Sequence, residues 1–136
     1  RGGERRIFDY FAAGWNRDGL ALRGAGQLLR AAPADKHLLI LLTDASPDDS
    51  HKIPPTGKIP LSREYDGQAG VSDTADEVRA LRRDGTRVAA VFMGESANVP
   101  NANAIYGRDL ARIRRMDQLA AAAGRLIQDE IRELAD

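Results

Sequence analysis

The segment 36–52, KHLLILLTDASPDDSHK, contains five consecutive aliphatic residues, at 38–42, followed directly by hydroxyl and carboxylate side chains. A run that is apolar at every position predicts a strand buried on both faces, as in parallel sheets. We therefore expect a strand over 37–43. Its polar end has two possible roles: a turn that stops the strand, or a site to which the strand delivers oxygen ligands.

The rest of the chain alternates between helical and strand patterns. The apolar residues repeat at helical spacing in three segments and run without interruption in two others. These patterns predict helices over 18–32, 71–85 and 116–134, a strand over 86–94 and a weaker, short strand over 110–114. The loop 95–109 contains at most one helical turn, near Ala104.

Capping residues mark the expected helix ends. Asp18 is a good N-cap for the first helix, Ser72 or Asp73 for the second, and Gly85 is expected to stop the second helix. The long connection 44–70 is rich in proline and glycine. A loop of this length inside a compact domain is usually functional or mobile.

The order of elements predicts an α/β fold with an open parallel sheet and helices on both of its faces. Ligands of such sheets collect at the carboxyl ends of the strands. Asp44 follows the first strand directly, and Asp18, at the start of the preceding helix, is expected at the same end. The corner 94–96 after the second strand also lies there.

Composition excludes several classes of protein. The 136 residues suit one domain, and 20 basic residues balance 20 acidic ones, so a general nucleic-acid binder is not expected. The chain has no cysteine, which excludes disulfides, zinc thiolates and cysteine nucleophiles. No apolar run approaches the length of a membrane span, so we expect neither a membrane segment nor a secretory signal, and a cytoplasmic location.

The polar end of the first strand offers oxygen ligands that suit Mg²⁺ or Mn²⁺. Asp44, Ser46 and Asp18 are the candidate metal ligands. Asp48 and Asp49 follow a proline and are more typical of a turn. No phosphate-binding glycine loop and no nucleophile elbow occur in the sequence.

The ordered set of segments resembles a known family. LLILLTDASPDD (38–49) followed by VRALRRDGTRVAAVFMG (78–94) resembles the second half of a von Willebrand factor type A domain. GWNRDGLALR (14–23), GVSDTADEVRALRRDG (70–85) and the segment 105–134 are similar to the bacterial branch that contains D-type nitric-oxide-reductase activation proteins and cobaltochelatase-like proteins. The resemblance covers about residues 7–134.

The resemblance implies a metal-ion-dependent adhesion site. Asp44 matches the family's third-loop aspartate, and Asp18 falls where a second-loop threonine is usual. The family's Asp-x-Ser-x-Ser motif is absent, and Ala45 replaces a frequent glycine. The family's strand order is 3-2-1-4-5-6, so residues 1–136 would form a partial domain with strands four to six alone. Mg²⁺ or Mn²⁺ would belong to the complete domain and bind this chain weakly or not at all.

The resemblance also implies a function. We expect a non-enzymatic interaction domain that assists an AAA-type ATPase in the maturation or metallation of a client metalloenzyme. Two alternatives stay open: a phosphoryl-transfer or metal-dependent enzyme that uses Asp44, and an inert structural fragment. Without the first strands, the strand 37–43 would have an open edge, which predicts a homodimer through 37–43. The alternative is that part of this edge is covered by the cluster of Ile7, Phe8, Tyr10, Phe11 and Trp15.

Overall fold

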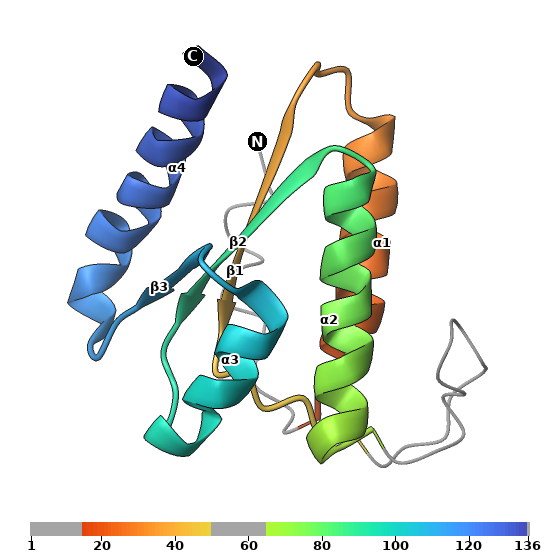
Figure 1. Ribbon diagram of the computed structural model, residues 1–136, viewed down its shortest axis with the longest axis vertical. Coiled ribbons are helices and arrows are strands. Elements are labelled where there is room, and N and C mark those ends of the chain that lie inside the picture. Colours follow the sequence, from red (N-terminus) through yellow and green to blue (C-terminus); the bar gives the residue numbers. More distant parts are fainter. Residues whose placement is uncertain (1–14, 50–64, 136) are drawn as a thin grey trace, which may run out of the picture.

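The computed structural model describes residues 15–49 and 65–135 (Figure 1). Four α-helices, two short 3₁₀ turns and three strands follow one another along this part of the chain. In chain order they are α1 (Asp18–Ala31), β1 (His37–Thr43), α2 (Gly67–Arg83), β2 (Thr86–Phe92), η2 (Ser96–Asn98), α3 (Val99–Tyr106), β3 (Leu110–Arg112), η3 (Met116–Gln118) and α4 (Leu119–Ala135). The alternation predicted from the sequence is confirmed.

The three strands form one parallel sheet in the order β1-β2-β3. β1 and β2 pair along their whole length, from His37 opposite Thr86 to Thr43 opposite Phe92. β3 adds three residues beside the end of β2. The weak third strand is therefore real but ends at Arg112, and β2 ends two residues before the expected boundary.

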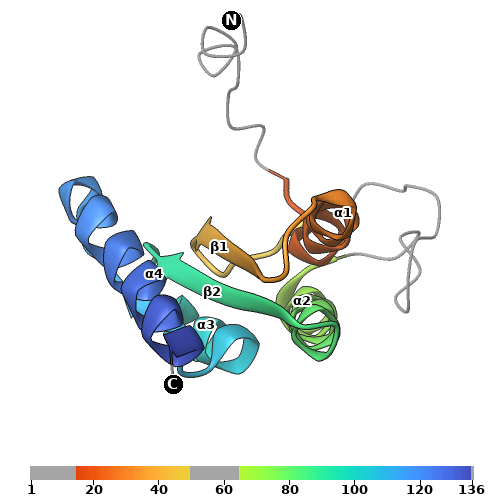
Figure 2. The same ribbon diagram turned by 90° about the horizontal axis from the view of Figure 1, so that it is seen from above.

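Helices cover both faces of the sheet, as predicted (Figure 2). On one face α2 and α3 pack against β2, and α1 packs against α2. The core there consists of Leu22, Val71, Ala75, Val78, Leu81, Val88, Ala90, Ile105 and Tyr106. On the other face α4 packs against the sheet through Leu119, Ala122 and Leu126, which contact Val91 and Ile113.

The two long strands differ in burial. Six of the seven residues of β2 are buried, as a continuously apolar strand predicts. β1 is only half-buried, and Leu42 is 52% exposed. The prediction that β1 is buried on both faces is wrong, because β1 lies at the edge of the sheet and has no strand beyond it in the described part of the chain.

Two predicted helix caps are also wrong. Asp18 is the first residue of α1, and its side chain makes no capping hydrogen bond. α2 begins at Gly67, so Ser72 and Asp73 lie within the helix, and Asp73 is buried. Gly85 does stop α2, with a φ of 86° that favours glycine. The helical turn expected near Ala104 extends over all of α3.

Within residues 15–49 and 65–135, no helix has the length and apolar character that a bilayer crossing requires.

Candidate functional site

The carboxyl end of β1 brings together two of the three predicted metal ligands. Asp44 follows β1 directly, and Asp18 is the first residue of α1. The negative charge of Asp44 contributes to raising the pKa of Asp18, so the two carboxyl groups are close enough to repel each other. This neighbourhood agrees with the rule that functional groups gather at the carboxyl ends of parallel strands.

A tight polar turn holds Asp44. Its Oδ1 accepts a hydrogen bond from the Ser46 backbone N–H at 3.1 Å, and the Ala45 N–H donates to Thr43 Oγ1 at 2.9 Å. Ala45 is fully buried with a φ of 53°, a conformation that glycine adopts more readily.

Glycine is required on the neighbouring strand end. A Cβ at Gly94 would lie 2.8 Å from the Asp44 carbonyl oxygen and 2.9 Å from Phe92 Cε2. The turn after β1 therefore packs directly against the chain after β2. The predicted corner at the carboxyl end of β2 supports the Asp44 turn through this close approach.

Asp18 is the less solvated of the two acids. Its Oδ1 accepts a hydrogen bond from Asn16 Nδ2 at 2.7 Å. Its Oδ2 is buried and has no hydrogen-bond partner among the described residues. Burial raises the pKa of Asp18, the hydrogen bond from Asn16 and the nearby Thr43 hydroxyl oppose the shift, and the charge of Asp44 raises the pKa further. A buried carboxylate oxygen without a donor is stabilised either by a proton or by a cation.

Tyr106 is a neighbour of Asp18 that the sequence analysis missed. Its ring belongs to the core, and its hydroxyl is buried without a hydrogen-bond partner in the described part of the chain. Burial raises the pKa of Tyr106, and the charge of Asp18 raises it further. No motif surrounds Tyr106 in the sequence, because its helix brings it to Asp18 only in the folded chain.

A buried polar cluster fixes the start of α1. The Tyr65 hydroxyl donates to Asp73 Oδ2 at 2.7 Å and accepts the Gly19 N–H at 3.1 Å. Burial raises the pKa of Tyr65 above its ordinary value. Asp18 precedes Gly19, so this cluster, which we call the Tyr65 anchor (Gly19, Tyr65, Asp73), positions Asp18.

The other polar residues after β1 make contacts within the fold. Asp49 is buried and pairs with Arg17, whose Nε lies 2.7 Å from Asp49 Oδ2. Asp48 bridges to Asn16, and its N–H donates to Asn16 Oδ1 at 3.3 Å. Asp48 and Asp49 therefore lie in isolated bridges and not in the turn that the sequence predicted. Ser46 meets Asp44 through its backbone N–H.

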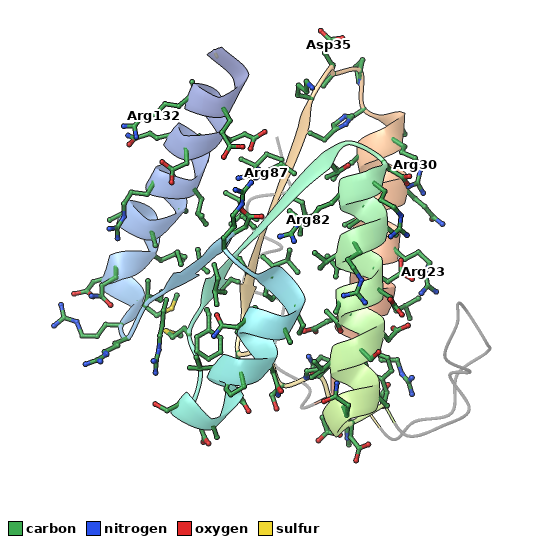
Figure 3. The ribbon with its side chains drawn as sticks, viewed as in Figure 1. Arg23, Arg30, Asp35, Arg82, Arg87 and Arg132 are labelled. Atoms are coloured by element: carbon green, nitrogen blue, oxygen red, sulfur yellow. The ribbon has the colours of Figure 1, made fainter. Side chains whose placement is uncertain are left out.

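Arg82 and Arg87, both labelled in Figure 3, form ion pairs away from the carboxyl end of β1. Asp109 pairs with Arg82 at 2.9 Å and with Arg87 at 3.0 Å. Arg87 also pairs with Glu130 and Glu133 of α4. Arg82 donates to two backbone carbonyls as well. These contacts join α2 to β2 and α3.

The fit to a metal ion is partial. Asp18, Asp44 and the Thr43 hydroxyl offer hard oxygen donors at one place, which suits Mg²⁺ or Mn²⁺. No group of three or more His, Cys, Asp or Glu side chains that could hold a metal occurs among residues 15–49 and 65–135. Two carboxylates supply fewer ligands than such an ion requires, so the arrangement fits an incomplete site.

The chain matches no family model, no curated protein and no solved structure.

Proposed function

We propose that this chain is a non-enzymatic protein-interaction domain of the von Willebrand factor type A kind, with an incomplete site for Mg²⁺ or Mn²⁺. One observation carries the proposal: Asp18 lies at the carboxyl end of β1, near enough to Asp44 for that charge to raise its pKa, and Asp18 Oδ2 is buried without a hydrogen-bond partner in the described chain. Such a pair gains most from a cation that neutralises both charges.

An acidic partner residue would complete this site. Mg²⁺ prefers six oxygen ligands and keeps several waters when the protein supplies few. A carboxylate from another protein would replace such a water and raise the affinity of both the ion and the partner. Following the resemblance in the sequence, the partner would be an AAA-type ATPase, and the assembly would act on a client metalloenzyme during its maturation or metallation.

Calorimetry with MgCl₂ and MnCl₂ tests the incomplete site. We expect weak binding by the chain alone, with Kd on the order of millimolar, because two carboxylates coordinate the ion. Saturable binding at micromolar metal, lost in Asp44→Ala, would show that the chain holds a complete site.

The Asp44→Ala variant separates a functional from a structural role. Asp44 is exposed, so its removal should change the free energy of unfolding by less than about 1 kcal/mol. Metal binding should be lost at the same time. Urea denaturation measures the first effect and calorimetry the second. A loss of several kcal/mol would make Asp44 a structural residue.

A phosphodonor assay separates the interaction domain from an enzyme. The chain is incubated with acetyl phosphate, with and without Mg²⁺, and its intact mass is measured. The proposal predicts no added phosphoryl group. A gain of one phosphoryl group that depends on Mg²⁺ and disappears in Asp44→Ala would show that Asp44 accepts phosphate, and the non-enzymatic proposal would fail.

A further inference from the structure

The outer edge of β1 carries a regular set of backbone groups that no described residue pairs as a strand. The Thr43 carbonyl accepts the Met93 N–H at 3.0 Å, so Thr43 directs its backbone groups toward β2. Backbone direction alternates along a strand, which means that residues 37, 39, 41 and 43 face β2. The N–H and C=O groups of Leu38, Ile40 and Leu42 therefore point away from the sheet.

This edge lacks the usual protection against strand pairing. Residues 38–42 are all leucine or isoleucine, without a charge, a proline or a bulge. No strand pairs with this edge within residues 15–49 and 65–135. The Leu42 side chain is 52% exposed there. A long apolar edge of this kind is a template for another strand.

We propose that a second copy of this chain occupies the edge, with the two β1 strands antiparallel about a two-fold axis at Ile40. In this register, a residue a given number of positions before Ile40 lies opposite the residue the same number of positions after Ile40 in the other copy. Ile40 exchanges both backbone hydrogen bonds with the Ile40 of the other copy. Leu38 and Leu42 exchange theirs across the axis in the same way, so all the outward groups of the strand are satisfied.

Charge complementarity favours this partner and this register. Lys36 precedes β1 and Asp44 follows it, so the antiparallel register places Lys36 of each copy opposite Asp44 of the other. A parallel pairing in the same register would instead place like charges opposite each other. The two-fold axis is perpendicular to the sheet, so both copies of α4 cover the same face of a continuous six-stranded sheet.

Sedimentation equilibrium of the full chain in EDTA tests the dimer apart from any metal. We expect twice the 14.8 kDa chain mass at tens of micromolar, an ordinary range for association. Lys36→Glu or Asp44→Lys alone should weaken the dimer about tenfold through like-charge contacts. The double variant should restore it. A monomer at these concentrations, or a double variant no tighter than the single ones, would overturn the proposal.

Cross-linking tests the register with variants that change one side chain. The chain has no cysteine, so each variant carries a single thiol. Cα atoms of a hydrogen-bonded antiparallel pair are about 5.5 Å apart, within disulfide range. Ile40→Cys should therefore form a disulfide dimer on mild oxidation. Leu42→Cys should not, because the two Leu42 residues are about four residues apart along the strands. Equal cross-linking of both variants, or none in Ile40→Cys, would contradict the two-fold axis at Ile40.

Discussion

Asp109, at the amino ends of the strands, differs from Asp18 and Asp44, at the carboxyl end of β1, in the ion pairs that it forms. At the amino ends of the strands, Asp109 pairs with Arg82 and Arg87, and α4 is attached by further ion pairs. At the carboxyl end of β1, Asp18 and Asp44 are neighbours, and neither has an ion pair within the described residues. Asp109 thus has two arginine partners, whereas Asp18 and Asp44 have no cationic side chain paired with them in the described part of the chain.

This difference distinguishes a structural role from a functional one. Pairing each acid with an arginine lowers the free energy of the folded state and joins α2, β2 and α4. Two acids without a cation raise that free energy, and such destabilisation is typical of sites that await a ligand. We therefore expect substitutions at the two ends to change stability in opposite directions.

The largest expected effect is at the Tyr65 anchor. A Cβ at Gly19 would lie 2.2 Å from Asp73 Oδ2 and 2.8 Å from Tyr65 Oη, both in buried side chains. Gly19→Ala should therefore lower the free energy of unfolding by roughly 3 kcal/mol, as overpacking does, and displace Asp18 from Asp44. Urea denaturation measures the change.

Gly24→Ala is the matched control on the same helix. A Cβ at Gly24 has no atom within 4 Å, and alanine is the better helix former. The control should raise the free energy of unfolding by roughly 0.5–1 kcal/mol. If both variants changed stability alike, helix propensity and not the anchor would explain the result.

The ion pairs at the amino ends should give the next largest effect. Asp109→Ala removes the shared acid and leaves Arg82 with no acidic partner among the described residues. We expect a loss of roughly 2 kcal/mol, smaller than for a fully buried pair because Arg82 and Arg87 are partly exposed. The control is Asp129→Ala, whose exposed pair with Arg132 should contribute no more than about 0.5 kcal/mol. Thermal denaturation at equal ionic strength compares the two variants.

Asp18→Asn should give a smaller effect of the opposite sign. The pKa of Asp18 is raised, so the folded chain holds that proton more tightly than the unfolded chain and loses stability as the pH rises through this pKa. The asparagine variant avoids this loss. It should be more stable than the wild type at neutral pH, by about 1 kcal/mol or less, and equally stable below the ordinary aspartate pKa of 3.8. Denaturation at several pH values measures the difference, and a variant less stable at neutral pH would contradict the account.

The sequence predicts the strands better than it predicts the helix starts. The apolar run 38–42 and the segment 86–92 read directly as strands, because a hydrophobic run is a local signal. The start of α2 was missed because Asp73 looks like a cap and is instead the buried acceptor of the Tyr65 hydroxyl. Tyr65 and Asp73 form this contact only in the folded chain, so no local sequence pattern indicates it.

The candidate site shows the same limit. Position after a strand predicted Asp44, and helix order predicted Asp18 at the same end of the sheet. The place of a residue in the sequence does not show that Asp49 pairs with Arg17 or that Tyr106 lies near Asp18. Such side-chain partners depend on packing between distant segments. The half-burial of β1 was likewise hidden, since an edge strand and a central strand can carry the same apolar run.

Mn²⁺ broadening of backbone amide resonances most directly tests whether Asp18 and Asp44 form a cation site. Substoichiometric Mn²⁺ is added to the ¹⁵N-labelled chain, the wild type is compared with Asp18→Asn and Asp44→Asn, and the titration is repeated at lower pH. We expect selective loss of the signals around residues 18–19 and 43–46 in the wild type, and weaker broadening in either variant. At lower pH the broadening in the wild type should also weaken, because protonation of Asp18 competes with the ion. Uniform broadening, or the same selective broadening in both variants, would contradict this expectation.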